Sequence, residues 1–506
     1  MPELMGIDFG TGGCKVTVID AVGTVKGSAY TEYATHYPHP GWSEQDPVDW
    51  IKALIKTVKA CLEQCDDTGR GLAGLAVTAS THNAVLTDSD GQIIRPCIMW
   101  TDQRSIDQTA WLKKQFGEQI FAIGMQYPSP TWTLPQLLWI KENEPEAYKR
   151  IARISFVKDH VRGFLTGDWC TDHVDAQGSL LYDARARAWS RDICAMIDLP
   201  ATVLPPVYKS KDVVGTVSQQ AAELTGLPAG LPVAAGCSDT AAEDFGAGAV
   251  EPGQMVIKLA TAGNVNIVTR EAQPHPKSFT YPHVVENIWY TALATNACAS
   301  SYRWFRDNFF VEEKNDFEKN GRNVYRFMDE LASQAPVGAL GLMYHPYLLG
   351  ERCPYYNSKL RASFIGMGMV HKKKHFARAV LEGVAFSLKD CYQIAQGITP
   401  GIKDVRLIGG GAKSRLWCQI VSDVIGVPVL KPKNDDSSFG GALLAGVGKG
   451  VFGSEIEAAK ICVKVENELQ PNWDNHARYG KFFEVYRDIV KDLEASYAKL
   501  YEYVAY

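Results

Sequence analysis

The stretch IDFGTGGCK, from Ile7 to Lys15, is a glycine-rich loop between two apolar segments. The apolar run before the loop ends in Asp8, and strand-like residues resume at Val16, so the loop joins a strand to a strand. A dinucleotide-binding loop instead joins a strand to a helix and has the spacing G-x-G-x-x-G. A tight turn of backbone N–H groups can wrap phosphate oxygens, and an acid at its entrance offers an oxygen ligand to a nucleotide's Mg²⁺. An ordinary glycine hairpin would show the same residues.

A second copy of this pattern lies in the later half of the chain. The segment IKLATAGNVNIVT, residues 257–269, aligns with IDFGTGGCKVTVI without gaps, so that Thr261 matches Thr11. Two related hairpins this far apart indicate a duplicated fold with a phosphate held between its halves. Lys258 stands where the first copy has Asp8, so the first loop is predicted to face the metal and the second only phosphate.

Length and composition favour a multi-domain enzyme in a reducing compartment. The 506 residues predict two to four domains, and we place one boundary so that the domains span residues 1–248 and 249–506. A formal net charge of −5 argues against a general nucleic-acid binder. The N-terminus lacks a basic and apolar leader, no run has membrane-spanning length, and the 12 cysteines have no metal-site spacing. A cytoplasmic location is therefore expected.

Helix and strand patterns alternate throughout, which predicts an α/β protein. Asp46 followed by proline is typical of a helix start, with Asp as the N-cap. Residues 84–100 have the pattern of a hairpin, and residues 134–165 the pattern of a helix interrupted at Pro145. Residues 476–503 predict one long helix with an aromatic packing stripe.

A third glycine-rich turn occurs in residues 405–429, where a strand runs into three glycines and then a helix from about Lys413. Glycines at this point let a flat ring or a phosphate approach the backbone, and the helix N-terminus favours negative charge. The segment lacks the G-x-x-x-x-G-K-[ST] pattern of a Walker A loop. Such turns are common in α/β folds, so this signal gains weight only with the others.

Asp239 follows an apolar strand at residues 232–236 and precedes an alanine-rich helix. Active sites of α/β proteins commonly lie at such strand ends. An ionised carboxylate there can orient a hydroxyl and accept its proton during phosphoryl transfer. For an isolated Asp in this position, a helix N-cap is the more frequent role.

Polar and aromatic side chains follow strand ends in the first half of the chain. Aromatic faces beside hydrogen-bonding groups suit a polyhydroxylated ligand. A lone histidine is more often structural, so this set depends on the other motifs. Its members are His82, Trp100, Asp102, Arg104 and Trp132.

Longer motifs resemble the FGGY carbohydrate kinases of the actin-like ATPase superfamily, over nearly the whole chain. Residues 362–382 (A-x-F-x-G-M, seven residues, then HFARAVLE) are similar to the family's C-terminal signature. TLPQLLWIKEN, residues 133–143, resembles the N-terminal signature but has Gln136 where that pattern has Lys. Several further segments are most similar to the xylulokinases: HPGWSEQDP (39–47), IMWTDQR (98–104), YLLGERCP (347–354) and LIGGGAKSRLW (407–417).

This resemblance implies an α/β fold of two actin-like (ribonuclease H-like) domains with a cleft between them. The N-terminal domain would carry the sugar side, the first phosphate loop and the catalytic Asp. The C-terminal domain would carry the second phosphate loop, the adenosine motif and the C-terminal helix. The implied enzyme uses ATP and Mg²⁺ to phosphorylate a small sugar, converting D-xylulose to D-xylulose 5-phosphate. Its partners would be sugar and ATP, without nucleic acid or membrane, and a homodimer is compatible with the family.

The resemblance also implies a role for each matching residue. Asp239 matches the catalytic base, and Asp8 and Asp239 match the metal ligands. The nucleotide positions are Thr11, Gly12, Lys15, Thr261, Gly263, Ala299, Arg303, Gly410, Gly411 and Ala412. The sugar positions are Thr81, His82, Asn83, Asp102, Trp132, Asp239 and Thr240.

Departures from the xylulokinase pattern gather around the sugar. Thr240 replaces an Asn, and Thr81-His82-Asn83 replaces Met-His-Gly. Because unmatched buried polar groups are costly, such changes can alter which hydroxyl pattern is accepted. Another ketopentose, a polyol or an autoinducer-type signal is therefore an alternative acceptor. An actin-like ATPase without a sugar would share the loops but not the sugar positions, and an NAD-dependent dehydrogenase is opposed by the strand–loop–strand start.

Overall fold

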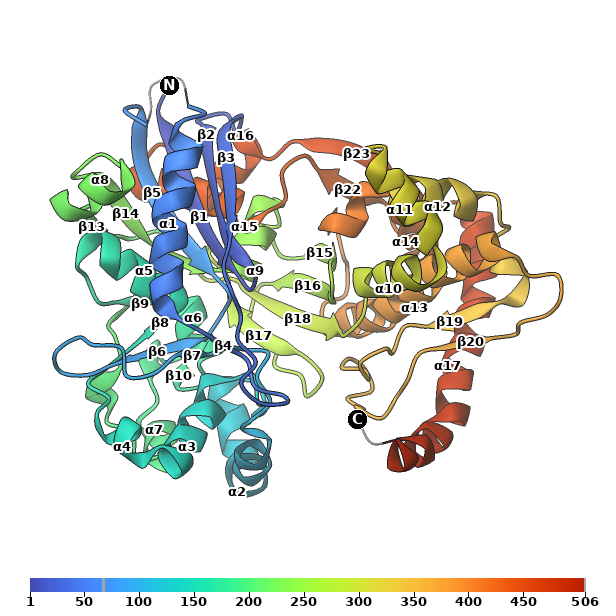
Figure 1. The fold of residues 1–506 in the computed structure, drawn as a ribbon, viewed down its shortest axis with the longest axis horizontal. Helices are drawn as coiled ribbons and strands as arrows, with labels where there is room; N and C mark the ends of the chain where they lie inside the picture. The colour runs from blue at the N-terminus through green and yellow to red at the C-terminus, as the bar shows by residue number, and fades with distance from the viewer. Residues whose placement is uncertain (66–68, 505–506) are drawn as a thin grey trace. The chain divides into compact units, whose positions relative to one another are not determined.

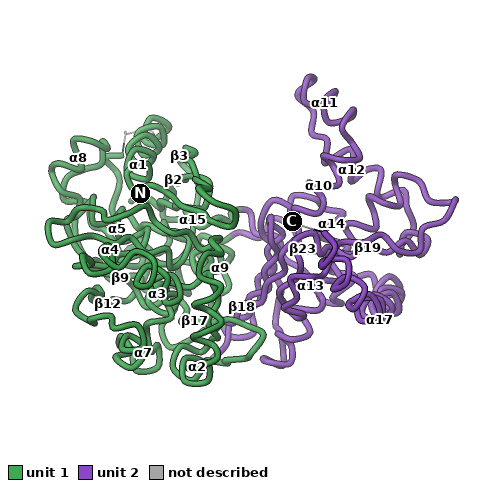
Figure 2. Tube along the Cα trace, turned by 60° about the horizontal axis from the view of Figure 1, so that its bottom comes forward, with its two compact units in different colours: residues 1–251, 270–290, 434–463 green, residues 252–269, 291–433, 464–506 purple. Residues whose placement is uncertain are grey.

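The computed structural model describes residues 1–65 and 69–504, which divide into two compact units (Figures 1 and 2). The first unit comprises residues 1–251, 270–290 and 434–463. The second comprises residues 252–269, 291–433 and 464–506. The chain first changes unit after Glu251, three residues from the division expected after residue 248, and it returns to the first unit twice.

The first unit is built on a six-stranded sheet with the order β13-β14-β5-β1-β2-β3. Strand β1 pairs antiparallel with β2 and parallel with β5, so the opening loop joins two strands as predicted. The bounds are β1 Glu3–Gly10, β2 Gly13–Asp20, β3 Val25–Glu32, β5 Leu72–Ala79, β13 Val213–Thr216 and β14 Pro232–Ser238.

The second unit repeats this arrangement in a sheet whose strands within the unit have the order β18-β16-β15-β21-β22-β23. Strand β15 pairs antiparallel with β16 and parallel with β21, as β1 does with β2 and β5. The duplication predicted from the two loops is therefore confirmed. The bounds are β15 Gln254–Leu259, β16 Gly263–Thr269, β18 Trp289–Thr295, β21 Asp404–Ile408, β22 Val429–Pro432 and β23 Val465–Leu469. Strand β17, Phe279–Pro282, belongs to residues 270–290 of the first unit.

The two loops differ by one residue, although their sequences align without a gap. In the first hairpin Gly10 pairs with Gly13, which leaves a two-residue turn. In the second hairpin Leu259 pairs with Gly263, which leaves the three-residue turn 260–262. Residues that align in sequence therefore have cross-strand partners that differ by one position: Asp8 pairs with Lys15, whereas Lys258 pairs with Asn264.

Helices and short strands complete each unit (Figure 1). The first unit has helices α1 Pro47–Leu62, α2 Ile106–Gly124, α3 Thr133–Asn143, α4 Pro145–Lys149, α5 Val157–Thr166, α6 His173–Gly178, α7 Arg191–Met196, α8 Gln219–Thr225, α9 Asp239–Gly246, α15 Ser437–Lys449 and α16 Glu455–Cys462. It also has strands β4 Glu44–Gln45, β6 Ala84–Thr87, β7 Cys97–Ile98, β8 Arg153–Phe156, β9 Thr171–Asp172, β10 Tyr182–Asp183, β11 Ala188–Trp189 and β12 Val207–Tyr208. The second unit has helices α10 Ala299–Phe309, α11 Val311–Lys319, α12 Val324–Ser333, α13 Lys373–Ile398, α14 Arg415–Ile425 and α17 Trp473–Tyr503, with strands β19 Met343–His345 and β20 Ser363–Ile365.

Two sequence expectations about the first unit were only partly right or wrong. Residues 84–100 turn back at Asp88–Gly91 as expected, with Thr87 and Ile93 in an antiparallel bridge, but the flanking strands pair elsewhere, β6 with β8 and β7 with β4. The helical stretch 134–165 contains strand β8, since the short apolar run after residue 150 pairs with β6. The start of α1 agrees with expectation: Asp46 is its N-cap and accepts a hydrogen bond from the N–H of Val48 at 2.9 Å.

The two faces of β1 are used differently, because successive side chains of a strand point to opposite sides. Met5, Ile7 and Phe9 belong to the apolar core that includes residues of α1 and α5. On the other face, Gly6 lies against α15, where a Cβ would be only 1.8 Å from the backbone oxygen of Ser438. Asp8 shares this second face, two residues further along the strand.

Replacing Gly6 by Ala should destabilise the first unit by about 3 kcal/mol, because the added methyl group would displace the backbone of α15. Thermal unfolding of the purified protein measures the loss. The matched control is Gly74→Ala on β5, where the nearest atom to an added Cβ is 3.5 Å away, an ordinary contact. Equal unfolding temperatures for the two variants would show that α15 does not depend on this close approach.

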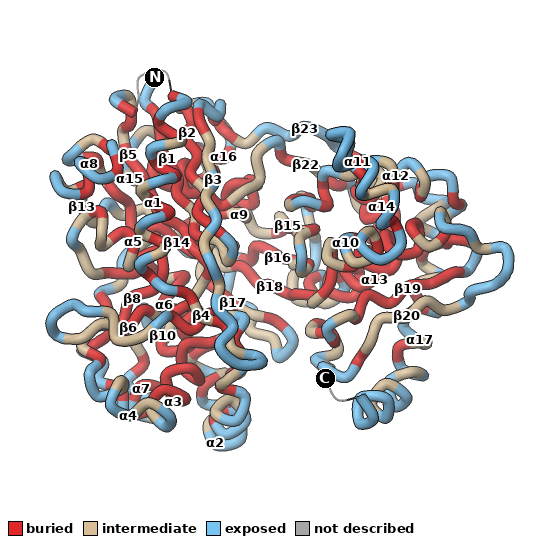
Figure 3. The backbone as a smooth tube through the Cα atoms, viewed as in Figure 1, coloured by how far each residue is buried: buried red, intermediate tan, exposed pale blue. Residues whose placement is uncertain are grey.

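Burial follows the strands of both sheets, whereas much of α2 and the C-terminal part of α17 are exposed (Figure 3). All twelve cysteines are buried free thiols. Within residues 1–65 and 69–504, no helix has both the length and the apolar character required of a membrane span.

Candidate active site

Asp239 is the first residue of α9, directly after β14. The N-cap of this helix is Ser238, whose hydroxyl accepts a hydrogen bond from the N–H of Ala241 at 3.3 Å. The Asp239 Oδ1 instead accepts from the N–H of Thr240 at 2.6 Å and lies 3.3 Å from the Thr240 hydroxyl. The N-cap interpretation of Asp239 is therefore wrong, because Ser238 fills that role.

A β-bulge in β14 sets the direction in which the chain enters α9. Ala234 pairs with Ala76 and Cys237 pairs with Thr78, so β14 carries one extra residue at this point. Gly236 has φ +80°, and a Cβ there would lie 1.9 Å from the Val77 carbonyl oxygen. Only glycine fits this position, and bulges of this kind commonly re-aim residues beside active sites.

Asp8 lies in a cluster of acidic side chains within the first unit. Burial raises the pKa of Asp8 well above its ordinary value, and the carboxylates of Asp239, Glu243 and Asp436 raise it further. The hydroxyl of Thr78 opposes this shift by donating to Asp8 Oδ1 at 2.9 Å. Negative charge accumulated in this way favours a bound cation.

The acidic side chains fit a magnesium ion that arrives with a nucleotide. Among the described residues, no group of three or more His, Cys, Asp or Glu side chains is arranged as a metal cage. Mg²⁺ is commonly bound by one or two carboxylates, several waters and substrate phosphates. Asp8 and Asp239 could supply those carboxylates.

The glycine-rich turn between β1 and β2, expected to bind phosphate, is held in place by side chains of the same unit. The backbone oxygen of Thr11 accepts from Gln45 Nε2 at 2.7 Å, and its hydroxyl accepts from Trp100 Nε1 at 3.1 Å. A Cβ on Gly13 would lie 2.5 Å from the Tyr30 ring, whereas Gly12 is exposed in the turn. The loop therefore presents its backbone at Gly12 while its flanks are fixed.

The side chain of Lys15, which follows this loop, forms an ion pair. Its ammonium donates to Asp436 Oδ2 at 2.8 Å. Asp436 is the N-cap of α15 and accepts from the N–H of Phe439 at 3.1 Å. Sequence reasoning missed Asp436, although Asp followed by two serines before an apolar run is typical of a helix start.

The turn between β15 and β16, also expected to bind phosphate, contacts the N-terminus of α10. The backbone oxygen of Thr261 accepts from the N–H of Cys298 at 3.0 Å and from the hydroxyl of Ser300 at 2.7 Å. The N–H of Ala299 donates to the oxygen of Ala260 at 2.7 Å. A Cβ on Gly263 would lie 2.7 Å from the methyl group of Thr295. Loop and helix therefore form one rigid element, with Arg303 exposed on α10.

The third glycine-rich turn follows β21 in the second unit. Gly409 has φ +87°, residues Gly410–Lys413 form a short 3₁₀ helix, and α14 begins only at Arg415. A Cβ on Gly411 would lie 2.8 Å from the Cβ of Leu259, and Ala412 is buried. A Cβ on Gly410 would meet no described atom within 4 Å, so this glycine leaves open backbone that a flat ring could approach.

His82 and Trp132 come together in the first unit. Their ring centroids lie 4.6 Å apart, and the Trp132 ring also packs edge-on against Phe279 at 5.2 Å. Burial lowers the pKa of His82 to about 3, so the imidazole is neutral at physiological pH. Its Nδ1 is buried and has no hydrogen-bond partner among the described residues. Thr81 lies beside it, with its methyl group 2.5 Å from where a Cβ on Gly178 would be.

Asn83 and Asp102 are buried and already occupied by bonds within the protein. Asn83 donates to the backbone oxygen of Ser80 at 3.0 Å and accepts from the N–H of Trp100 at 2.5 Å. Asp102 accepts from the N–H of Ser43 at 2.6 Å and from the Arg104 side chain at 2.8 and 2.9 Å. Both are expected to contact the sugar, and each already makes these bonds within the protein.

Tyr281 lies near the site but was not found from sequence. Burial raises the pKa of its hydroxyl, and the carboxylates of Asp175 and Asp239 raise it further. Tyr281 belongs to residues 270–290, which follow the second hairpin and return to the first unit. The sequence carries no signal for that return.

Comparison with known families gives two matches that together cover most of the chain. Residues 4–246 match the N-terminal domain, and residues 255–448 the C-terminal domain, of the FGGY family of carbohydrate kinases.

Individual relatives match along their whole length. The xylulose kinase of Bacillus subtilis (strain 168) is 32% identical over 502 residues, which cover 98% of this chain and 99% of that protein. The crystal structure of a xylulose kinase from Rhodospirillum rubrum has a TM-score of 0.89 and 26% identity, and the match covers 98% of this chain and all of that one. An autoinducer-2 kinase of Salmonella paratyphi B is 28% identical over 97% of this chain and 94% of its own.

Proposed function

Because the chain belongs to the FGGY family of carbohydrate kinases, we propose that it transfers the γ-phosphate of ATP to the terminal hydroxyl of D-xylulose. The product would be D-xylulose 5-phosphate. The observation that carries this choice of sugar is the end-to-end similarity to xylulose kinases, at 32% identity for the protein from Bacillus subtilis. The antiparallel β1–β2 hairpin opposes the alternative of a nicotinamide-dependent dehydrogenase, which needs a strand–loop–helix start.

Asp239 would act as the general base. The bulge in β14 comes just before Asp239, which begins α9, and Ser238 rather than Asp239 caps that helix. The carboxylate would orient the attacking hydroxyl and accept its proton as the bond to phosphorus forms and the bond from the γ-phosphorus to the bridging oxygen breaks. Thr240, which donates to Asp239 Oδ1, would hold one carboxylate oxygen in place.

The first loop would bind phosphate chiefly through its backbone. Gly12 is exposed in the turn, and Gln45 and Trp100 fix Thr11 beside it. Asp8 and Asp239 would hold Mg²⁺, which when bound neutralises negative charge on the phosphates. Lys15 would complete the loop by fixing it to Asp436 at the N-terminus of α15.

In the second unit, the two remaining glycine-rich elements would bind the rest of the nucleotide. Thr261 and Gly263 would contact phosphate in the second loop, with Ala299 and Arg303 of α10 beside them. Gly410, Gly411 and Ala412 would contact the adenosine, since the backbone at Gly410 is open.

The sugar would be bound by a neutral histidine and aromatic surfaces. His82 has an unpartnered buried Nδ1 that a sugar hydroxyl could satisfy, and Trp132 packs against its ring. Thr81 and Thr240 would contact the sugar directly. Asn83 and Asp102 would keep the surrounding loops in position through the bonds that they already make.

The acceptor can be tested with a panel of ketopentoses, ketohexoses, polyols and the autoinducer-2 signal, measured by sugar-dependent ATP consumption. We expect D-xylulose to give the highest kcat/KM. If another compound is phosphorylated well while D-xylulose shows no turnover, then the departures at Thr81 and Thr240 predict the acceptor better than the overall similarity to xylulose kinases does. The relative named autoinducer-2 kinase indicates one such acceptor. ATP turnover that no compound stimulates would favour an actin-like ATPase without a sugar.

We further propose a cytoplasmic location and a homodimer. The twelve buried free thiols suit a reducing compartment. Sedimentation of the purified protein at several concentrations tests the assembly.

A further inference from the structure

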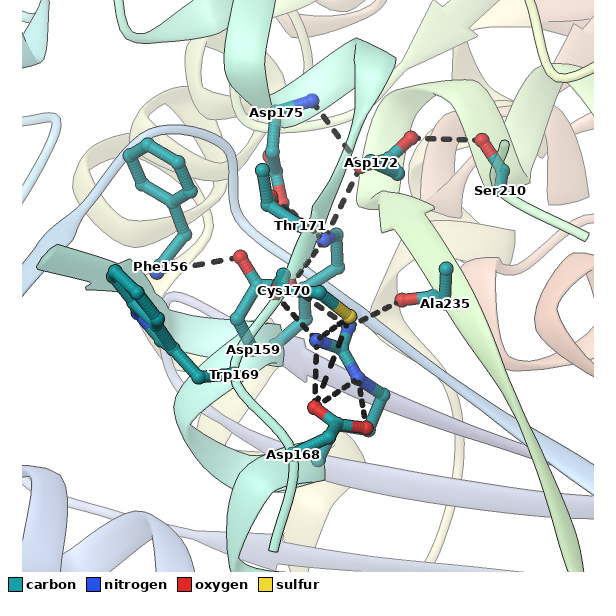
Figure 4. Close-up of polar contacts among 12 residues, drawn as sticks. Phe156, Asp159, Asp168, Trp169, Cys170, Thr171, Asp172, Asp175, Ser210 and Ala235 are labelled. Carbon is teal, nitrogen blue, oxygen red and sulfur yellow. Dashed lines mark hydrogen bonds and ion pairs between the residues drawn. The ribbon is translucent and has the colours of Figure 1, made fainter. Parts of the chain in front are cut away.

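A buried network of charged side chains lies between α5 and α6 in the first unit (Figure 4). Lys158 contacts the carboxylates of Asp159 at 2.5 Å, Asp172 at 3.2 Å and Asp175 at 3.2 Å. Arg162 contacts Asp159 at 2.8 Å. These side chains are at most 2% exposed. Buried charges are costly unless they are paired, so a network of this size calls for a reason beyond stability.

Lys158 and Arg162 are the two cations of this network. Burial alone would lower the pKa of Lys158, but its three carboxylate neighbours raise it above the usual value, so the ammonium stays charged. Burial raises the pKa of Asp175, and the neighbouring Lys158 opposes this shift. The acidic side chains therefore surround cations whose burial would be costly without them.

Arg162 connects this network to the bulge that precedes Asp239. Its Nη1 donates to the carbonyl oxygen of Ala235 at 2.7 Å, and its Nη2 donates to the carbonyl oxygen of Cys170 at 2.5 Å. Ala235 and Gly236 are the residues at which the pairing of β14 with β5 is interrupted. The guanidinium thus supplies a donor that the interrupted strand pairing does not.

The remaining backbone groups of the bulge are held from the same side. The N–H of Ala235 donates to the oxygen of Asp212 at 2.8 Å, and the N–H of Gly236 donates to the oxygen of Ser210 at 2.9 Å. The hydroxyl of Ser210 in turn donates to Asp172 Oδ2 at 2.7 Å. Network and bulge are therefore joined at two points, through Arg162 and through Ser210. Figure 4 shows the Ser210 hydroxyl beside Asp172.

We propose that Arg162 is a positioning residue for phosphoryl transfer, which fixes the β14 bulge and thereby the direction of Asp239. The planar guanidinium reaches Ala235, Cys170, Asp159 and Asp168 at once, whereas a lysine ammonium could not make all of these contacts. The inference rests on the proposed role of Asp239, which the Asp239→Asn variant tests separately.

The test measures kcat and KM for Arg162→Lys in two backgrounds, with Asp239 and with Asp239→Asn. Because small misplacements of a catalytic group are costly, we expect kcat to fall about 10–100-fold with Asp239 present, while KM for ATP and sugar changes less than about threefold. In the Asp239→Asn background the same substitution should change kcat less than about threefold, since the group it positions is already disabled. A loss of correctly folded protein would lower kcat by the same factor in both backgrounds.

Two further variants keep the outcome decisive. Arg378→Lys is the matched control, because this guanidinium is also buried and bound to a carboxylate, Glu382, at 2.8 Å; it should lower the unfolding temperature but leave kcat unchanged. If Arg162→Lys does not fold, Asp168→Asn replaces it, since Asp168 holds the guanidinium from a partly exposed position. An equal loss of kcat in both backgrounds, or an unchanged kcat with Asp239 present, would overturn the proposal. If Asp239→Asn alone retains full kcat, the proposed base is wrong, whatever Arg162 does.

Discussion

Replacing Asp239 by Asn should lower kcat by about 10²–10⁴-fold, the usual cost of removing a general base. The amide keeps the shape of the side chain and can still accept from the N–H of Thr240, but it loses the charge and basicity. KM for the sugar should change much less, because the amide can still bond to a hydroxyl. Steady-state kinetics with saturating ATP measures both quantities.

The matched control is Asp46→Asn. Asp46 is a true N-cap, at the start of α1, and Asn is nearly as good a cap as Asp. This variant should keep both kcat and the unfolding temperature. A kcat for Asp239→Asn within threefold of the unchanged protein would remove Asp239 from the mechanism and leave the base unassigned.

Replacing Asp8 by Asn should abolish most Mg²⁺-dependent turnover and raise thermal stability. The loss follows from removing a metal ligand, which is worth several kcal/mol or about 10²–10³-fold in rate. The gain follows from the raised pKa of Asp8: a carboxylate whose pKa is higher folded than unfolded destabilises the fold when ionised at neutral pH. Asn can still accept from Thr78, so packing is kept.

Magnesium titrations of activity and melting curves without ligand check the two halves of this expectation. Asp20→Asn is the control, because Asp20 lies at the opposite end of the same hairpin and accepts from turn N–H groups at 3.0 and 2.8 Å. It should leave the magnesium requirement unchanged. Near-normal activity of Asp8→Asn with an unchanged magnesium requirement would show that Asp8 is only a strand residue.

The sequence was sufficient for the parts of the fold that local patterns encode. The loop at Ile7–Lys15 and its copy at residues 257–269 predicted two related halves, and the sheets have the same strand pairings. Local patterns failed where pairing is long-range. The local pattern predicts helix at β8, because this segment becomes a strand only through its pairing with β6, about 70 residues earlier.

The same distinction holds for the candidate site. Asp239 stands out in the sequence because a strand end before a helix is a local signal. The contacts around it do not, since Arg162 reaches Ala235 across 73 positions and Lys15 reaches Asp436 across 421. Nor does the sequence tell which polar side chains, such as Asn83 and Asp102, already make hydrogen bonds within the protein.

The return of residues 434–463 to the first unit has a consequence for how the protein is made. Helix α15 packs against β1 at Gly6, and its N-cap Asp436 holds Lys15. When the first 250 residues have been synthesised, α15 has therefore not yet been made, although it covers one face of the sheet in the first unit. The glycine-containing face of β1 stays uncovered until almost the whole chain has emerged from the ribosome. Cutting the protein at the border between its sequence halves would place α15 on the fragment that lacks β1.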